Sequence, residues 1–444
     1  MNLDLVIRGG RVHGGDGFAP RSVAVSEGVV VSIAAIDAPL EADRHVYLAE
    51  DEVLVPGIVD THVHVNEPGR TEWEGFATAT RAAAAGGVTT ILDMPLNSIP
   101  PTTDVAALRS KQQAATGQCH VDVGFWGGAV PASLGRLRTL RDAGVFGFKC
   151  FLLDSGAPEF PPLLGDQLEA AMREIAEVDG LLIVHAEDGS TIEAAPPAYG
   201  RSYQVFLRSR PRESENTAIQ HVIDAARRTH CRVHIVHLSS AGAVAALSAA
   251  REEGIRITVE TCPHYLTVCA EQIGDGQTQF KCCPPIRDDS NRDGLWQALA
   301  DGVIDVIVSD HSPCTPELKL FTTGDFGAAW GGVSSLQLGL SLVWTEADRR
   351  GHDLNDVIRW MSTNTAELVG ALGKGRIAVG HDADLVVLAP DQSFVVDPAA
   401  LHHRHPVSPY AGRTLSGVVR RTYLRGIPVT GTAPHGAFLA PEGC

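Results

Sequence analysis

Short apolar runs alternate with amphipathic stretches through the middle of the chain. The runs are rich in Val, Ile and Leu and predict buried strands, while the stretches between them, such as 75–85 and 167–178, have helical spacing. Eight strands are predicted, at 58–64, 88–93, 121–126, 145–151, 181–185, 232–237, 255–261 and 304–309. Eight strands that alternate with helices over residues 56–372 predict an α/β fold, a (β/α)8 TIM barrel.

Both ends of the chain have a different pattern. Residues 3–8 and 22–35 alternate like short strands beside glycine turns, and residues 384–388 and 417–426 do the same. We expect the two ends to pair into one small β-sandwich domain, formed by residues 1–55 and 373–444. This domain would bracket a barrel domain of residues 56–372.

Length, charge and cysteine use narrow the class of protein. The 444 residues exceed a usual single core, which agrees with a large domain and a smaller one. The net charge of −17 argues against nucleic acid or an anionic membrane as a partner. The sequence has no apolar run long enough to span a membrane and no secretion signal, so we expect a cytoplasmic protein. Its nine cysteines form no CxxC pair and are predicted to be reduced, mostly buried thiols.

Six residues of metal-ligand type stand at the ends of predicted strands, where a TIM barrel gathers its chemistry. His62 and His64 alternate along the first strand, so both imidazoles face one point. A lone histidine in a strand is more often a satisfied core residue, so the hypothesis depends on the whole set. The other four follow later strands: Lys149, His185, His237 and Asp310.

Lys149 is the least expected of the six, because it lies in the apolar run 145–152 of a chain that has only five lysines. An ammonium group buried there must lose its proton or find a compensating charge. A neutral amine can react with carbon dioxide and become a carbamate, which is an anionic oxygen ligand. The alternative is a structural lysine in a salt bridge.

Four imidazoles, one aspartate and one carbamate could hold two divalent ions. Zinc favours such ligands and keeps an open position when catalytic, although cobalt, nickel, manganese or iron would also fit. Two ions can activate water and polarise a carbonyl, and Asp310 is the candidate to carry the proton to a leaving nitrogen. The predicted chemistry is hydrolysis of a cyclic amide. His234 is expected to face away from this site, and His402, His403 and His405 are expected in a solvated loop.

Four motifs carry a resemblance to a known family: 56–76, 147–151, 308–314 and 407–414. Over nearly its whole length the chain resembles the cyclic amidohydrolases of the amidohydrolase superfamily, and among them the allantoinases. The resemblance implies a binuclear metal centre on the six strand-end residues, with Lys149 carboxylated. It also implies hydrolysis of the hydantoin ring of allantoin to allantoate in purine breakdown, and a homotetramer.

Relatives within the superfamily share these ligands, so other positions must separate them. Dihydroorotases carry an arginine two residues after the second histidine, where this chain has Asn66, and an amide lacks the bidentate grip of a guanidinium on a carboxylate. Hydantoinases and dihydropyrimidinases carry a tyrosine where this chain has Asp154. The substrate contacts implied by the resemblance are Asn66, Cys283, Ser312 and Gly332.

Two alternatives remain open from the sequence. The first is a hydantoinase or dihydropyrimidinase of broader specificity, which Asn66 does not exclude. The second is a non-catalytic assembly protein on the same fold. Such proteins lose ligands, whereas all six ligand positions are filled in this chain, so we favour an enzyme.

Overall fold

Eight parallel strands form the central barrel of the structure, a computed structural model that describes residues 2–441. Almost every residue in them is buried, because both faces of a parallel sheet are covered. This explains their continuous Val/Ile/Leu runs. The strands are β6 (Ile58–Val63), β7 (Val88–Asp93), β8 (Asp122–Phe125), β10 (Phe148–Phe151), β11 (Leu181–His185), β12 (Arg232–Ile235), β13 (Ile257–Thr261) and β14 (Val306–Ile307).

Parallel pairing closes these strands into a ring. Hydrogen bonds connect β6, β7 and β8, in that order, in one group, and the consecutive strands from β10 through β14 in another. The two-residue strand β9 (Gly127–Gly128) follows β8 and pairs with β10. A parallel bridge between Val63 and His311 joins the first strand to the segment after the last. The TIM barrel predicted from the sequence is confirmed. The last predicted strand, 304–309, is shortened to Val306–Ile307, because the chain beyond it turns towards Val63 and Val333.

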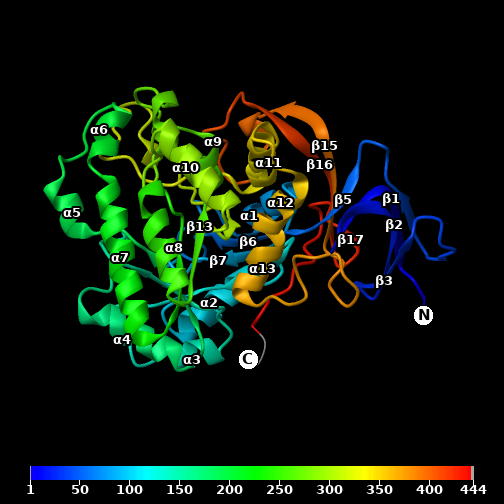
Figure 1. The fold of residues 1–444 in the computed structure, drawn as a ribbon, viewed down its shortest axis with the longest axis horizontal. Helices are drawn as coiled ribbons and strands as arrows, with labels where there is room; N and C mark the ends of the chain where they lie inside the picture. The colour runs from blue at the N-terminus through cyan, green and yellow to red at the C-terminus, as the bar shows by residue number, and fades with distance from the viewer. Residues whose placement is uncertain (1, 442–444) are drawn as a thin grey trace.

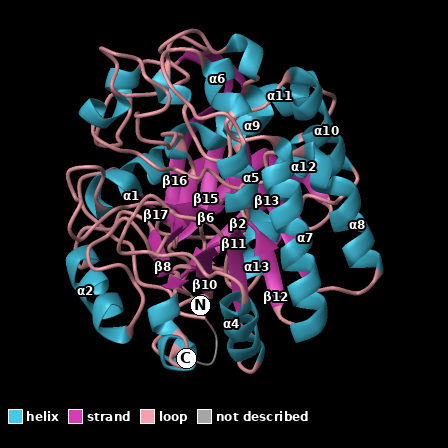
Figure 2. Cartoon of the chain, turned by 90° about the vertical axis from the view of Figure 1, so that its left-hand side faces the viewer, coloured by secondary structure: helices cyan, strands magenta, loops and turns pink. Residues whose placement is uncertain are grey.

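Helices surround the strands on the outside (Figure 2). The longest, α7 (Arg212–Thr229), shows why: Ile219, Val222 and Ile223 are buried on one face, with acidic residues in its first turn and arginines in its last. The others are α1 (Phe76–Ala85), α2 (Val105–Ala115), α3 (Leu137–Asp142), α4 (Asp166–Ala176), α5 (Gly189–Ala194), α6 (Tyr203–Arg208), α8 (Val244–Glu252), α9 (Pro263–Thr267), α10 (Asp289–Ala300), α11 (Gly339–Arg349), α12 (Leu354–Ile358) and α13 (Asn364–Val369).

The two ends of the chain meet in a second sheet beside the barrel (Figure 1). Antiparallel pairing of β5 with β15 joins the N-terminal strands to the C-terminal ones. Leu5, Val25, Leu54, Leu385 and Tyr423 share its small apolar core. The expected β region is therefore present, as one hydrogen-bonded sheet. Its strands are β1 (Leu5–Gly14), β2 (Gly17–Ser26), β3 (Val29–Ala35), β4 (His45–Tyr47), β5 (Val53–Pro56), β15 (Leu385–Val395), β16 (Thr414–Leu424) and β17 (Ile427–Pro428).

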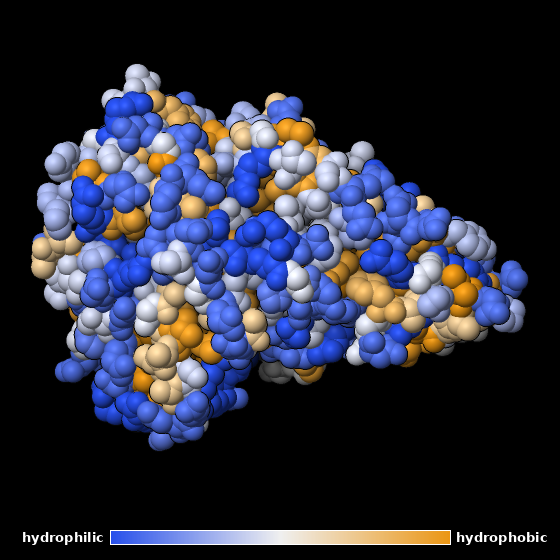
Figure 3. Space-filling view, turned by 45° about the horizontal axis from the view of Figure 1, so that its top comes forward, coloured by the Kyte–Doolittle hydropathy of each residue, from blue (hydrophilic) through white to orange (hydrophobic). Residues whose placement is uncertain are grey.

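Figure 3 shows the hydropathy of one face of the molecule. Apolar residues lie there in small groups among polar ones, and the molecule narrows towards the end that carries β1–β3 in Figure 1. Among residues 2–441, no helix is both long and apolar enough to cross a membrane. The eight cysteines of that range are free thiols, and all but the partly exposed Cys283 are buried. Cys444 lies outside the described residues.

Candidate metal centre

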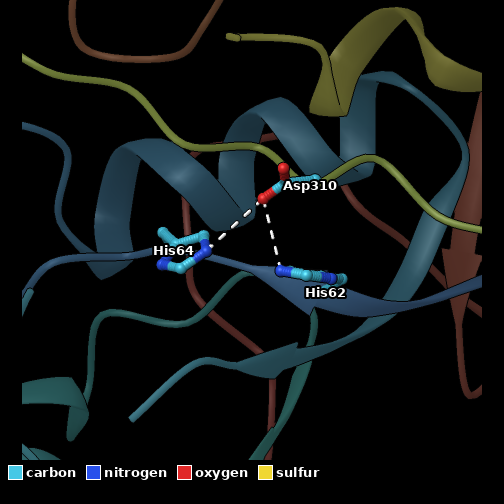
Figure 4. Close-up of side chains that lie close together, drawn as sticks. All are labelled: His62, His64 and Asp310. Carbon is cyan, nitrogen blue, oxygen red and sulfur yellow. Dashed lines mark ion pairs between the residues drawn. The ribbon is translucent and has the colours of Figure 1, made fainter. Parts of the chain in front are cut away.

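His62, His64 and Asp310 meet where the first and last strands of the barrel end (Figure 4). His62 lies in β6, and both imidazoles point their Nε2 atoms at Oδ1 of Asp310, at 3.3 and 3.4 Å. Asp60 ties the same two strand ends together, because its carboxylate accepts hydrogen bonds from the backbone N–H of His62 and of Ser309. The period-2 spacing therefore does what the sequence predicts, and places two ring nitrogens at one point.

The structure brings all six predicted ligands around one cavity of about 510 Å³. The ring centroids of His62 and His237 are 5.5 Å apart, and those of His185 and His237 are 4.6 Å apart. His237 and Asp310 both have positive φ angles, +40° and +43°, which are costly for residues other than glycine. The surrounding fold holds this strain at two of the residues that would bind a metal.

Burial favours the neutral form of three of these imidazoles, which is the form that binds a metal. It lowers the pKa of His64 to about 4, lowers that of His185, and places that of His237 well below its ordinary value. Burial has the opposite effect on Asp310, but the imidazoles of His62, His64 and His237 outweigh it and hold the Asp310 pKa well below its usual range. The centre thus offers neutral nitrogen donors beside an ionised carboxylate.

Lys149 lies in β10 and is 1% exposed. Burial lowers the pKa of its amine to about 8. Among residues 2–441 no carboxylate lies within ion-pair distance of its Nζ, so the structural alternative of a salt-bridged lysine is not what the fold builds. Part of the Lys149 amine is therefore neutral near physiological pH, and the neutral amine is the form that reacts with carbon dioxide.

Two buried glutamates that the sequence analysis missed hold the histidines in place. Glu260, in β13, lies 2.5 Å from Nδ1 of His62 and 2.9 Å from Nε2 of His234. Glu187 lies 2.8 Å from Nε2 of His185. A carboxylate on one ring nitrogen orients the other nitrogen towards a metal. The sequence carried a weak signal for both, since Glu260 is a charged residue within the predicted strand 255–261 and Glu187 follows His185 by two residues.

Three of the four ligand histidines have a buried ring nitrogen that fits a bound cation. Nε2 of His62, Nδ1 of His64 and Nδ1 of His237 are buried polar atoms without a hydrogen-bond partner among the described residues. Such atoms are costly unless something occupies the space beside them. Cys262 and His264 also approach Asp310, but burial raises the Cys262 pKa well above its ordinary value and keeps that thiol protonated. The donor set that remains is nitrogen and oxygen, as expected for zinc-like ions.

Three of the four predicted substrate contacts line the cavity, and one does not. Cys283, Ser312 and Gly332 are in its wall. Asn66 is buried outside that wall, and its amide donates to the carbonyl of Pro313 at 3.3 Å. Its left-handed backbone, with φ of +67°, turns the side chain into the loop after β14. The N–H of Gly332 is also taken, by the carbonyl of Lys281, whereas that of Gly331, which lines the cavity, has no acceptor among the described residues.

The histidine cluster near residue 403 differs from its prediction. His402 and His405 are partly or largely exposed, but His403 is buried, with its ring 5.7 Å from that of His311. His311 in turn lies 3.1 Å from the buried carboxylate of Glu74. The prediction of a fully solvated loop is wrong for His403, because this loop packs behind the segment that carries Asp310. His234 agrees with its prediction, since it faces Glu260 and Thr258.

Comparison with known proteins identifies the family of this fold and site. Residues 53–429 match the Amidohydrolase family. The chain belongs to the amidohydrolase family. Its members are typically metal-dependent hydrolases, and the cluster of His62, His64 and Asp310 agrees with that chemistry. The family resemblance expected from the sequence motifs is confirmed.

Two relatives that are named as allantoinases match all or most of the chain. It is 56% identical over 442 residues to the allantoinase of Streptomyces avermitilis, covering 100% of this chain and 98% of that protein. It is 49% identical over 396 residues to the allantoinase of Saccharomyces cerevisiae, covering 88% and 85%. Among solved structures, L-hydantoinase (dihydropyrimidinase) from Arthrobacter aurescens has a TM-score of 0.92 at 29% identity, covering 99% of this chain and 100% of that one.

Proposed function

We propose that this amidohydrolase is an allantoinase, which hydrolyses the hydantoin ring of allantoin to allantoate in purine breakdown. Water adds across one ring amide, the C–N bond breaks, and a neutral ring becomes an open anion with a carboxylate. The observation that carries the proposal is the 56% identity, over the full chain, to an allantoinase. The cavity of about 510 Å³ is of the size that small-molecule sites have.

Two divalent ions, most simply zinc, would be held by nitrogen and oxygen donors, and Lys149 would bridge them as its carbamate. Cobalt, nickel, manganese or iron would suit the same donors. Bound ions would activate water and polarise the ring carbonyl. Support for this proposal comes from the unpartnered ring nitrogens and from the absence of a carboxylate beside Lys149 in residues 2–441. The proposed ligands are His62, His64, Lys149, His185, His237 and Asp310.

The protein's own groups position the reaction and move the proton. Asp310 is ionised and lines the cavity, so it accepts a proton from the attacking water and returns it to the leaving ring nitrogen. Ser312 donates a hydrogen bond to Oδ1 of Asp310 at 3.2 Å and orients that carboxylate. Gly331 lies in the wall of the same cavity, and its N–H suits a ring carbonyl oxygen.

A hydantoinase or dihydropyrimidinase activity is the second candidate, favoured by the TM-score of 0.92 to an L-hydantoinase. Fold similarity at 29% identity does not separate these substrates, because the ligands are common to the superfamily. Asp154, which stands where those enzymes have a tyrosine, is exposed and lines the cavity. A carboxylate there does not supply the hydroxyl that a tyrosine would give.

A substrate panel tests the proposal. Purified protein of measured metal content should hydrolyse allantoin with a higher kcat/KM than hydantoin or dihydrouracil, and dihydroorotate should be essentially inert. Dihydroorotate carries a carboxylate on the reacting ring. Dihydroorotases place an arginine where this chain has Asn66, which is uncharged and lies outside the cavity wall, so no cation stands at that position. A preference for dihydrouracil or hydantoin would favour the second candidate. Comparable rates on dihydroorotate and allantoin would contradict both.

Assembly, compartment and domain division are further parts of the proposal. We infer a homotetramer that acts in the cytoplasm on a small molecule, without nucleic acid or membrane as a partner. One relative, from Aquarana catesbeiana, is called a mitochondrial allantoinase, so fractionation is the direct test of compartment. The proposed domains are residues 1–55 with 373–444, and residues 56–372. Light scattering of the metal-loaded protein tests the tetramer.

A further inference from the structure

All five lysines of this chain are buried. Lys111 has its counter-ion in Asp93, at 2.5 Å, and Lys374 lies among three aspartates. Lys149 belongs to the proposed metal centre. The burial of Lys281 and Lys319 is not explained by an ion pair, because among residues 2–441 neither ammonium group has a carboxylate within ion-pair distance. Neither residue is among the proposed metal ligands.

Lys281 and Lys319 grip the same segment, residues 327–332, by its carbonyl oxygens. Nζ of Lys281 donates to Gly327 at 3.0 Å and to Ala329 at 2.5 Å. Nζ of Lys319 donates to Trp330 at 3.0 Å and to Gly332 at 2.5 Å. Burial lowers the pKa of each lysine, but two carbonyl acceptors per ammonium group replace part of the lost water and favour the charged form.

The two lysines differ in what they face. Lys281 lines the proposed substrate cavity and also a neighbouring cavity of about 550 Å³, whereas Lys319 lines neither and lies behind the segment. An ammonium group has three N–H donors, and two of those on Lys281 are used. One donor therefore remains at the junction of the two cavities, on a charge that has no carboxylate within ion-pair distance among the described residues. Nζ lies 5.3 Å from the centroid of the Phe206 ring, and the exposed Glu193 also lines both cavities. Arg210 also lines both cavities, but Glu187 balances its charge.

We propose that Lys281 binds the carboxylate of an anionic ligand, the ring-opened ureido acid, at this junction. The proposal rests on the proposed function, because ring opening turns a neutral substrate into a carboxylate anion. Two acidic residues, Asp154 and Glu193, line the substrate cavity, and both are exposed. Lys281 is then a specificity residue that distinguishes product from substrate by charge, and Lys319 is a positioning residue that holds the segment.

The test compares two inhibitors of similar size that differ at one terminal group: N-carbamoylglycinate, a ureido carboxylate, and N-carbamoylglycinamide, its neutral amide. Inhibition is measured on the metal-loaded enzyme with whichever cyclic amide the wild type hydrolyses, so an error in the allantoin assignment would be seen separately. Lys281→Met should weaken inhibition by the anion about tenfold relative to the amide, because a single charge at close range is removed. Lys281→Arg should keep most of the preference for the anion.

Lys319→Met is the matched control, because it removes the same charge from behind the segment. It should change inhibition by the anion and by the amide alike. An anion-to-amide ratio that is the same in wild type and Lys281→Met overturns the proposal, and so does an equal loss of the ratio in Lys319→Met. Lys281→Gln, which keeps a hydrogen-bond donor without charge, replaces Lys281→Met if the latter does not fold, and the same ratio decides.

Discussion

Two clusters of buried ionisable groups, one at each end of the barrel's first strands, use lysine in opposite ways. Lys374 lies 2.6–2.7 Å from Asp122, Asp382 and Asp384, and these carboxylates outweigh burial and raise its pKa. Lys149 has no such partner among residues 2–441, and burial lowers its pKa to about 8.

This difference in ion pairing determines whether each cluster has room for a metal ion. Three aspartate oxygens within 4.8 Å of one another resemble a metal site, but Lys374 already occupies the space between them, and Arg425 adds a second cation on Asp122. That cluster, in which two cations face three carboxylates, is an anchor between the barrel and the terminal sheet. Asp310, by contrast, forms no ion pair with a lysine or arginine in the described part of the chain. Absence of a counter-charge, rather than the number of acidic residues, marks the site that needs an ion.

The largest effect is expected for Lys149→Ala, which should leave a folded barrel with little bound metal and almost no turnover. The side chain supplies the proposed bridging anion, and a methyl group supplies none. Metal analysis and kcat on the purified variant measure this, and added short carboxylic acids with metal should restore some activity. Full metal content with a normal rate would rule the bridging role out.

Asp310→Asn should retain much of the metal and lose about 10²–10⁴-fold in kcat, the usual contribution of general acid–base catalysis. The amide keeps the shape of the side chain but not its proton affinity. Steady-state kinetics with metal content on the same sample check this. Near wild-type kcat would mean that another group moves the proton.

Lys374→Met should act on stability and leave the metal centre alone. It strips the buried carboxylates of Asp122 and Asp384 of a cation, and breaking a buried ion pair typically costs about 3–5 kcal/mol. Denaturant unfolding of the metal-loaded protein measures the loss. Metal content should stay at the wild-type level. A fall in metal with unchanged stability would reverse the roles of the two clusters.

Glu260→Gln should weaken metal affinity by about 10–100-fold, the usual cost of losing a carboxylate behind a histidine ligand. Glu260 touches both His62 and His234 and its own pKa is about 2, so it is ionised at neutral pH. Competition with a chelator gives the affinity. An unchanged value would leave Glu260 with a packing role only.

The sequence predicts the barrel and its candidate ligands well because both follow from periodicity. Parallel strands that are buried on both faces have nearly continuous apolar sequences, and the candidate ligands lie at the ends of these runs. Asn66 lies outside the cavity wall because its left-handed backbone directs its amide to the carbonyl of Pro313. The sequence alone does not reveal this backbone conformation. The burial of His403 beside His311 depends on segments that pack together across more than 90 residues, which one sequence does not reveal. The sequence marks Glu260 only as a charged residue in a predicted strand, and its contact with His62 likewise depends on the fold. The lack of a counter-ion for Lys149 could not be predicted from the sequence, since it depends on which carboxylates lie near the amine in three dimensions.

The most direct test of the central claim is to reconstitute metal-free protein with zinc and ¹³C-bicarbonate and to observe the carbamate carbon by NMR. We expect one lysine carbamate signal per chain in the wild type and in Lys374→Met, and none in Lys149→Ala. A wild-type protein that binds its metal and turns over substrate without that signal, or a signal that survives in Lys149→Ala, would contradict the account of a metal centre built around a carboxylated Lys149.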